Sequence, residues 1–307
     1  MSFGVDLRVR IGSVELPNPV MTASGTSGHG AELDAFFPLR DLGAVVVKSL
    51  AAEPWAGNPA PRIHEAAAGM LNSVGLQGPG VEAWLADDLP ALERAGARVV
   101  ASIWGRSVDE YAKAAAMLAD APPSVVAVEV NLSCPNVEAR KEMFAHSPVA
   151  TADAVAATAV AGRPRWAKLS PNVTDLVEIA AAAVDAGADA VTLINTVMGM
   201  ALDPETRRPR LGAGGGGLSG PAIRPVAVRA VYDVHAALPQ LSIVGVGGVT
   251  RAEDAVELLL AGASAVQVGT ATFADPRAPS RVRQGLEHWC RAHGVERVAD
   301  LTGGTHG

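Results

Sequence analysis

Short apolar runs recur along the chain and alternate with longer segments of helical periodicity. Eight of these runs are apolar at successive positions, which is typical of strands buried on both faces of a parallel sheet. They lie at residues 19–23, 44–48, 98–103, 125–131, 165–169, 190–195, 242–246 and 265–269. Between them, apolar positions with helical spacing predict helices over residues 80–95, 108–119, 174–186, 221–238, 251–261 and 279–293.

The ends of these elements carry residues that helices and hairpins need. Thr174 and Thr250 are predicted N-caps, and Gly187 and Gly262 are predicted to follow helix C-termini. Two short alternating runs within residues 5–16 flank a Gly-Ser pair, which predicts a β-hairpin. We expect this hairpin to close one end of the fold.

Strands that alternate with helices in this way predict a parallel α/β sheet covered by helices. Eight strands within about 250 residues favour a closed (β/α)8 TIM barrel. A doubly wound open sheet is the alternative, because periodicity does not establish closure. We interpret residues 1–307 as a single barrel domain, with an inserted loop region between strands six and seven.

Composition excludes several classes of protein. Hydrophobic residues make up 49% of the 307 residues and charged residues 19%, which suits a chain with a large core. The net charge is -7 and no basic stripe is present, so nucleic acid is not an expected partner. No apolar run approaches the roughly 20 residues of a membrane span, and the N-terminus lacks a signal-peptide core. We therefore expect a cytoplasmic protein.

Polar residues stand where several predicted strands end. Lys48, Asn131 and Asn195 each close an apolar run, and Lys168 lies next to the end of another. The carboxyl ends of barrel strands meet on one rim, where TIM-barrel active sites lie. In residues 127–131 the odd positions share a face, so Asn131 is predicted to point toward the barrel axis while the valines between point toward helices. The sequence thus predicts a polar site on this rim.

Cys134 follows the fourth strand directly, in the run NLSCPN. The other cysteine, Cys290, is distant and forms no C-x-x-C pair with it, so the chain has no ligand set for structural zinc or an iron-sulfur cluster. From its place at the rim we interpret Cys134 as a catalytic base, with Asn131 and Asn136 holding its substrate.

Glycines after the last two strands indicate a phosphate site. Gly247 and Gly248 follow the seventh strand, and Gly269 and Thr270 follow the eighth, where barrels often bind phosphate on backbone N–H groups. The alternative is that these glycines only make turns. Residues 212–217 contain G-x-G-x-x-G but follow no buried strand, so we interpret them as a loop that approaches a ligand rather than a dinucleotide motif.

Seven motifs, in order over nearly the whole chain, resemble those of the dihydroorotate dehydrogenases. They are NSVGLQGPG (72–80), NLSCPN (131–136), AKLSP (167–171), INTVMGM (194–200), GGLSGPAIRPVA (216–227), VGVGGV (244–249) and AVQVGTA (265–271). The cysteine at 134 and the residues after INT resemble the B-type of class 1. The resemblance implies a (β/α)8 barrel that carries FMN, in agreement with the strand count.

The resemblance also implies the reaction, which is oxidation of dihydroorotate to orotate in pyrimidine biosynthesis. Cys134 would remove the C5 proton and FMN N5 would accept the C6 hydride. The implied substrate-binding residues are Lys48, Asn72, Ser73, Val74, Gly75, Leu76, Asn131, Asn195 and Thr196. The implied FMN-binding residues are Ser24, Lys48, Ser49, Ser102, Asn131, Lys168, Ile194, Gly220, Gly247, Gly248, Gly269 and Thr270.

Partners follow from the same resemblance. B-type enzymes pass electrons through a second subunit that carries FAD and a [2Fe–2S] cluster to NAD, and a homodimer of this chain is expected. The chain departs from the B-type in having Ser102 where that type usually has Asn, with the bulky Trp104 nearby. It also departs in a charged segment, VEARKEMFAHSP, at 137–148 that is predicted to form a lid behind Cys134.

The sequence leaves two competing hypotheses. One is a related FMN barrel enzyme that acts on another dihydropyrimidine. The other is a barrel without turnover that serves as a binding or assembly module, a reading motivated by the charged lid and Ser102. No nucleophile elbow, H-E-x-x-H or G-K-[ST] motif is present, so hydrolase and NTPase readings are set aside.

Overall fold

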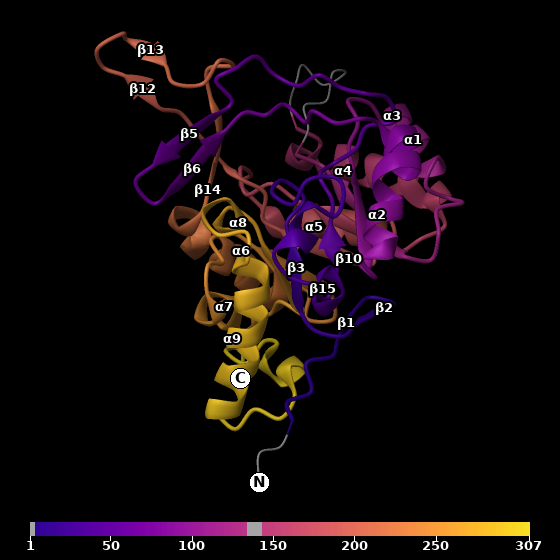
Figure 1. The fold of residues 1–307 in the computed structure, drawn as a ribbon, viewed down its shortest axis with the longest axis vertical. Coiled ribbons are helices and arrows are strands. Elements are labelled where there is room, and N and C mark those ends of the chain that lie inside the picture. Colours follow the sequence, from indigo (N-terminus) through magenta and orange to yellow (C-terminus); the bar gives the residue numbers. More distant parts are fainter. Residues whose placement is uncertain (1–3, 134–142) are drawn as a thin grey trace.

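Eight parallel strands form the central sheet of the computed structural model, which describes residues 4–133 and 143–307 (Figure 1). The strands are β3 (Val20–Thr22), β4 (Val45–Val46), β7 (Val99–Ile103), β8 (Val125–Asn131), β9 (Arg165–Lys168), β10 (Ala190–Leu193), β15 (Ser242–Val246) and β16 (Ala265–Val268). Each pairs with its neighbours in chain order. All eight strands predicted from the apolar runs are therefore confirmed.

The sheet closes between its first and second strands. Met21 and Ala44 form a parallel bridge, and the N–H of Gly43 donates to the carbonyl of Val20 at 2.8 Å. The Thr22 hydroxyl adds a contact to β4 by donating to the carbonyl of Val46 at 3.1 Å. These contacts make the sheet a (β/α)8 barrel, and they rule out the doubly wound open sheet.

Helices cover the outside of the barrel because each buries one apolar stripe against the strands. They are α1 (Val81–Ala83), α2 (Leu89–Arg94), α3 (Val108–Ala116), α4 (Pro148–Ala157), α5 (Leu176–Asp185), α6 (Arg224–Ala237), α7 (Ala252–Leu260), α8 (Ala271–Ala274) and α9 (Ala278–Ala292). Single turns lie at η1 (Glu32–Ala35), η2 (Leu39–Asp41), η3 (Trp84–Asp88), η4 (Phe144–His146), η5 (Thr158–Ala161), η6 (Pro221–Ile223) and η7 (Val298–Leu301). All six predicted helices are present, whereas α4 and α8 were not predicted.

The two predicted N-caps are wrong by one residue. Helix α5 is capped by Asp175, whose carboxylate accepts the N–H of Glu178 at 3.0 Å. Helix α7 has Arg251 at its N-cap, and the Arg251 N–H donates to the Asp254 carboxylate at 3.1 Å in a capping box. Gly187, with φ +91°, follows the C-cap of α5 as predicted.

The N-terminal hairpin closes the amino end of the barrel, as predicted. It consists of β1 (Val9–Ile11) and β2 (Val14–Leu16), which pair antiparallel. Gly12 in its turn donates its N–H to the hydroxyl of Ser242 at the start of β15, at 3.0 Å. This contact fixes the hairpin beneath the barrel.

A second sheet lies at the opposite end of the molecule from the N-terminus (Figure 1). It contains β5 (Ile63–Ala66), β6 (Gly69–Asn72), β11 (Val197–Gly199) and β14 (Gly216–Ser219), in the order β11-β14-β6-β5. The projecting pair β12 (Leu202–Asp203) and β13 (Arg208–Pro209) extends it. The inserted region between strands six and seven is therefore confirmed. Hairpin β5–β6 was not predicted, and the loop prediction for 212–217 is wrong where β14 begins.

None of the helices in the described ranges is long and apolar enough to cross a membrane. The described residues also hold no group of three or more His, Cys, Asp or Glu side chains placed to bind a metal ion.

Candidate active site

A cavity of about 1070 Å³ opens at the carboxyl ends of the barrel strands. Its walls include residues that directly follow β3, β4, β8, β10, β15 and β16, together with residues of the second sheet. Barrel enzymes place their active sites at this end, because the loops that follow the strands converge there. The cavity is also larger than a typical pocket for one small ligand, which measures about 300–1,000 Å³.

The cavity brings together nearly all of the residues predicted for the site. Those that line it are Ser24, Lys48, Ser49, Asn72, Ser73, Val74, Gly75, Leu76, Asn131, Lys168, Ile194, Asn195, Thr196, Gly220, Gly247, Gly248, Gly269 and Thr270. They come from segments that are up to 246 residues apart in sequence, from Ser24 to Thr270. The residues predicted at the strand ends therefore lie together around one cavity.

Three predicted residues are exceptions. Cys134 and Asn136 belong to residues 134–142, which lie outside the described part of the chain. Ser102 is fully buried and does not line the cavity. Its hydroxyl lies 2.9 Å from that of Ser49 and donates to Glu129 at 3.3 Å, so it sits one layer below the cavity. The structure thus places Ser102 outside the cavity lining, and its predicted contact with FMN stays a prediction.

Amide side chains cluster on one side of the cavity. The Asn131 Oδ1 atom accepts hydrogen bonds from Asn195 Nδ2 and from the N–H of Ser133, both at 3.2 Å. Asn72 reaches the carbonyl of Gly217 on the second sheet at 3.3 Å. Asn172, which was not predicted, donates to the carbonyl of Thr196 at 3.1 Å. Neutral donors and acceptors therefore alternate along this wall.

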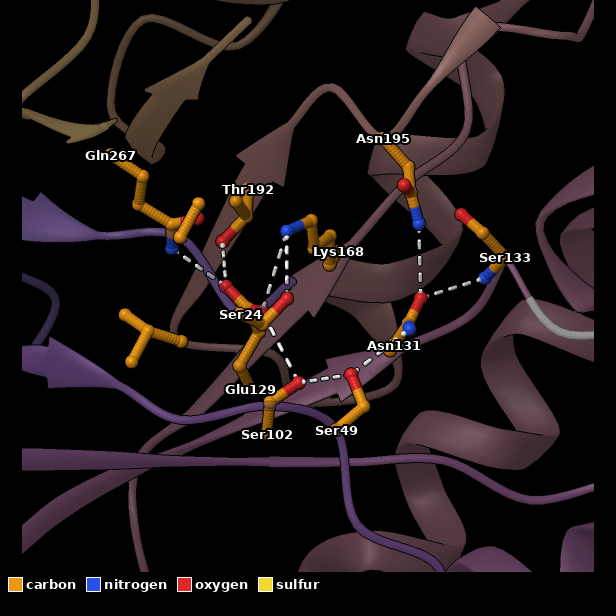
Figure 2. A network of polar contacts seen from close by, with 12 residues as sticks. Ser24, Ser49, Ser102, Glu129, Asn131, Ser133, Lys168, Thr192, Asn195 and Gln267 are labelled. Atoms are coloured by element: carbon orange, nitrogen blue, oxygen red, sulfur yellow. Dashed lines mark hydrogen bonds and ion pairs between the residues drawn. The ribbon is translucent and has the colours of Figure 1, made fainter. Parts of the chain in front are cut away.

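Lys168 lies between the cavity and a buried carboxylate (Figure 2). Its ammonium group donates to the Ser24 hydroxyl at 3.1 Å and lies 3.6 Å from Glu129 Oε1. Both partners of this ion pair are almost fully buried, with side-chain exposures of 6% and 0%. Glu129 was not predicted as a site residue. Its signal was present, because it shares the axis-facing positions of β8 with Asn131.

Lys48 also affects the electrostatics of the rim. The pKa of His29 is lowered from 6.5, first by burial and then by the charge of Lys48. The Nε2 atom of His29 is buried and has no hydrogen-bond partner among the residues that the structure describes, in keeping with a neutral ring. The charge of Lys48 thus also acts on His29, which does not line the cavity.

Another part of the cavity wall is formed by backbone with few side chains. Gly220, Gly247 and Gly248 have φ values of +92°, +139° and +73°, which side-chain-bearing residues rarely adopt. A Cβ atom on Gly248 would lie 2.6 Å from the Cβ of Arg224. The Thr270 hydroxyl donates to that of Ser219 at 2.8 Å beside them. The glycines therefore bring bare backbone to the cavity surface.

A closed (β/α)8 barrel with a large cavity at the carboxyl ends of its strands places the chain in the TIM-barrel class, whose enzymes carry their active sites at this end. The family model for dihydroorotate dehydrogenase matches residues 6–290, so the chain belongs to the dihydroorotate dehydrogenase family.

Full-length relatives agree. Proteins from Pelobacter propionicus and Alkaliphilus oremlandii are each 49% identical over 299 residues, which cover 97% of this chain and 98% of each relative. A protein from Desulforudis audaxviator is 50% identical over 303 residues, which cover 98% of both chains. All three bear the name dihydroorotate dehydrogenase B (NAD(+)), catalytic subunit.

Proposed function

We propose that this chain is a flavin-dependent oxidoreductase that oxidises dihydroorotate to orotate in pyrimidine biosynthesis, with FMN as its flavin and residues 1–307 as one domain. The observation that carries the proposal is that the amide cluster, the buried lysine and the glycine backbone all line one cavity. Family membership and the names of the relatives support it.

The residues present fit FMN. The cavity of about 1070 Å³ has room for a flavin beside a small ring. Gly220, Gly247, Gly248, Gly269 and Thr270 would hold the phosphate, because glycine backbone lets N–H groups approach an anion closely. Ser24, Ser49, Asn131 and Ile194 would hold the rest of the flavin. Lys168 would lie against the ring system, where its cation stabilises negative charge.

The substrate would lie against the amide wall. Asn72 with the backbone through Leu76, and Asn131, Asn195 and Thr196, would bind the carboxylate and the ring amides of orotate. Amide side chains offer both donors and acceptors, which matches a ring that carries both. Lys48 would supply the cation for this anionic ligand.

Cys134 is the proposed base for the C5 proton of dihydroorotate, and Sγ is the atom that would receive it. When bound, FMN supplies the acceptor for the C6 hydride. The asparagine side chains would orient the ring so that C5 faces the cysteine. A thiolate is the form that accepts a proton, so the reaction depends on the fraction of Cys134 that is deprotonated.

The relatives' name, catalytic subunit, supports a partner subunit that takes electrons onward to NAD. We propose that this partner carries FAD and a [2Fe–2S] cluster, that the chain forms a homodimer, and that the assembly is cytoplasmic. Met198, Met200 and Leu202 are 63%, 58% and 62% exposed on the second sheet and its projection, which supports a protein contact there.

Rates with two substrates test the proposal. The FMN-loaded chain is given dihydroorotate or dihydrouracil with an artificial electron acceptor, and the formation of orotate or uracil is followed by absorbance. The proposal predicts turnover of dihydroorotate at least a hundredfold faster. Preferential turnover of dihydrouracil would favour the alternative, a related barrel enzyme acting on another dihydropyrimidine.

A further inference from the structure

Glu129 is a fully buried carboxylate in the middle of β8, beneath the cavity and outside its lining. It receives hydrogen bonds from Ser102 on β7, Thr192 on β10 and Gln267 on β16, at 3.3, 3.3 and 2.7 Å. The ammonium group of Lys168 on β9 lies 3.6 Å away. All four partners are donors, so the group accepts throughout, as an ionised carboxylate does. Such a charge is retained only where it is well paired.

The carboxylate gives a direction to a chain of hydrogen bonds that ends in the amide cluster (Figure 2). Ser102 donates its single hydroxyl hydrogen to Glu129, so in the 2.9 Å contact between Ser102 and Ser49 the donor is Ser49. The Ser49 oxygen is then the acceptor for Asn131 Nδ2, at 3.2 Å. We call Ser102, Ser49, Asn131 and Asn195 the amide relay.

The relay fixes which way the Asn131 amide is turned. With Nδ2 directed at Ser49, Oδ1 faces Asn195 Nδ2 and the N–H of Ser133, both of which donate to it. If the Asn131 amide were reversed, its NH2 group would face two donors and its oxygen would face the Ser49 oxygen. The charge of Glu129 thereby orients, through two serines, amides that line the cavity.

The second contact of Glu129 leads to the flavin side. Lys168 is held between Glu129 Oε1 and Ser24 Oγ, and both Lys168 and Ser24 line the cavity. The carboxylate partly neutralises the ammonium group, so it moderates the positive charge that Lys168 presents there. Glu129 is therefore connected to the amide cluster through Ser102 and Ser49 and to Lys168 directly, although it does not line the cavity.

We propose that Glu129 is a positioning residue with two separable effects: it orients the substrate-binding amides through Ser102, and it sets the charge that Lys168 presents to the flavin. This inference rests on the proposed function. The two effects use different contacts of Glu129, so each can be removed by its own substitution.

Ser102→Ala removes the hydroxyl that connects Glu129 to the rest of the amide relay, and it leaves the Glu129–Lys168 ion pair in place. We expect the dissociation constant of orotate, measured from the change in flavin absorbance, to rise about fivefold or more, with a smaller shift in the flavin midpoint potential than Glu129→Gln causes. Glu129→Gln removes the charge but keeps an acceptor for Ser102. We expect its flavin midpoint potential to rise by about 30 mV, which is a tenfold change for a two-electron couple, with orotate affinity close to that of the wild type.

Thr192→Val is the matched control, because Thr192 donates to the same carboxylate but belongs to neither path. It is expected to lower the melting temperature of the flavin-free chain while orotate affinity and potential stay at wild-type values. The inference is overturned if Ser102→Ala leaves orotate affinity unchanged, if Glu129→Gln leaves the potential unchanged or lowers it, or if Thr192→Val reproduces either effect. A wild-type chain that neither binds orotate nor is reduced by dihydroorotate would instead contradict the proposed function.

Discussion

The two sides of the cavity are built by opposite means. On the amide side, Asn72, Asn131 and Asn195 present hydrogen-bonding side chains held by neighbours at 3.2–3.3 Å. On the glycine side, Gly220, Gly247 and Gly248 present backbone in conformations that exclude side chains. A substitution on the amide side therefore removes a contact, whereas a substitution on the glycine side adds atoms where a ligand or a neighbour must lie.

The largest effect is expected from the proposed base, Cys134. Cys134→Ala should lower kcat by about 10²–10⁴-fold, the usual contribution of a general base, while the flavin stays bound. In the wild type, kcat should rise with pH toward the ordinary thiol pKa of about 8.5.

Cys290→Ala is the control for this prediction. Cys290 is fully buried in α9, and burial together with the Glu287 carboxylate raises the pKa of its thiol. Its replacement should leave the rate within about twofold. If Cys134→Ala keeps the wild-type rate, the assignment of the base is wrong and a different proton acceptor is required.

On the glycine side, Gly248→Ala should weaken FMN binding by more than tenfold, measured by quenching of flavin fluorescence. The new Cβ would meet Arg224 at 2.6 Å and the carbonyl of Gly220 at 3.0 Å, and both would have to shift. The matched control is Gly162→Ala, at φ +61° with nothing within 4 Å of the new Cβ. Gly162→Ala has a similar backbone cost of about 1 kcal/mol, but its new Cβ meets no neighbouring atom. It should therefore lower the stability of the chain and leave FMN affinity unchanged.

On the amide side, Asn195→Ala should weaken orotate binding by roughly five- to a hundredfold, because loss of a buried hydrogen-bonding group costs about 1–3 kcal/mol. FMN affinity should change little. Asn18→Ala is the control, since Asn18 is a buried amide that precedes β3 and lies outside the cavity. Equal effects of both variants on orotate affinity would show that general destabilisation, and not the amide wall, is responsible.

The smallest effect concerns His29, next to the rim. Its pKa is lower in the folded chain than the ordinary value of 6.5, so the unfolded chain binds the proton more readily. The stability that depends on neutral His29 is therefore complete above about pH 6.5 and is lost as the pH falls below it. His29→Gln should flatten the fall in melting temperature between about pH 6.5 and 5. An unchanged slope would remove His29 as the cause.

The barrel could be predicted from sequence because each buried strand is apolar on both faces. A polar residue at the end of several of these strands marks the end that lies at the rim. The same alternation turned Asn131 toward the axis correctly. It places Glu129 on the same face, but a carboxylate in the interior becomes interpretable only when its donors from β7, β9, β10 and β16 are located.

Hairpin β5–β6 could not be predicted in the same way. Its burial pattern over Ile63–Ala66 alternates between exposed and half-buried, so it lacks an apolar run. It is stabilised by pairing of β6 with β14, which lies about 145 residues further along the chain. The depth of Ser102 below the cavity could not be predicted for a related reason. The sequence shows that it lies on the third strand, but not how far below the rim its side chain ends.

The most direct test of the account is an anaerobic titration of the FMN-loaded chain with dihydroorotate, followed by flavin absorbance. The account predicts that the yellow colour is bleached and that one orotate forms for each flavin reduced. A chain that binds FMN but stays yellow with excess dihydroorotate, or one that stays colourless when FMN is added, would contradict it.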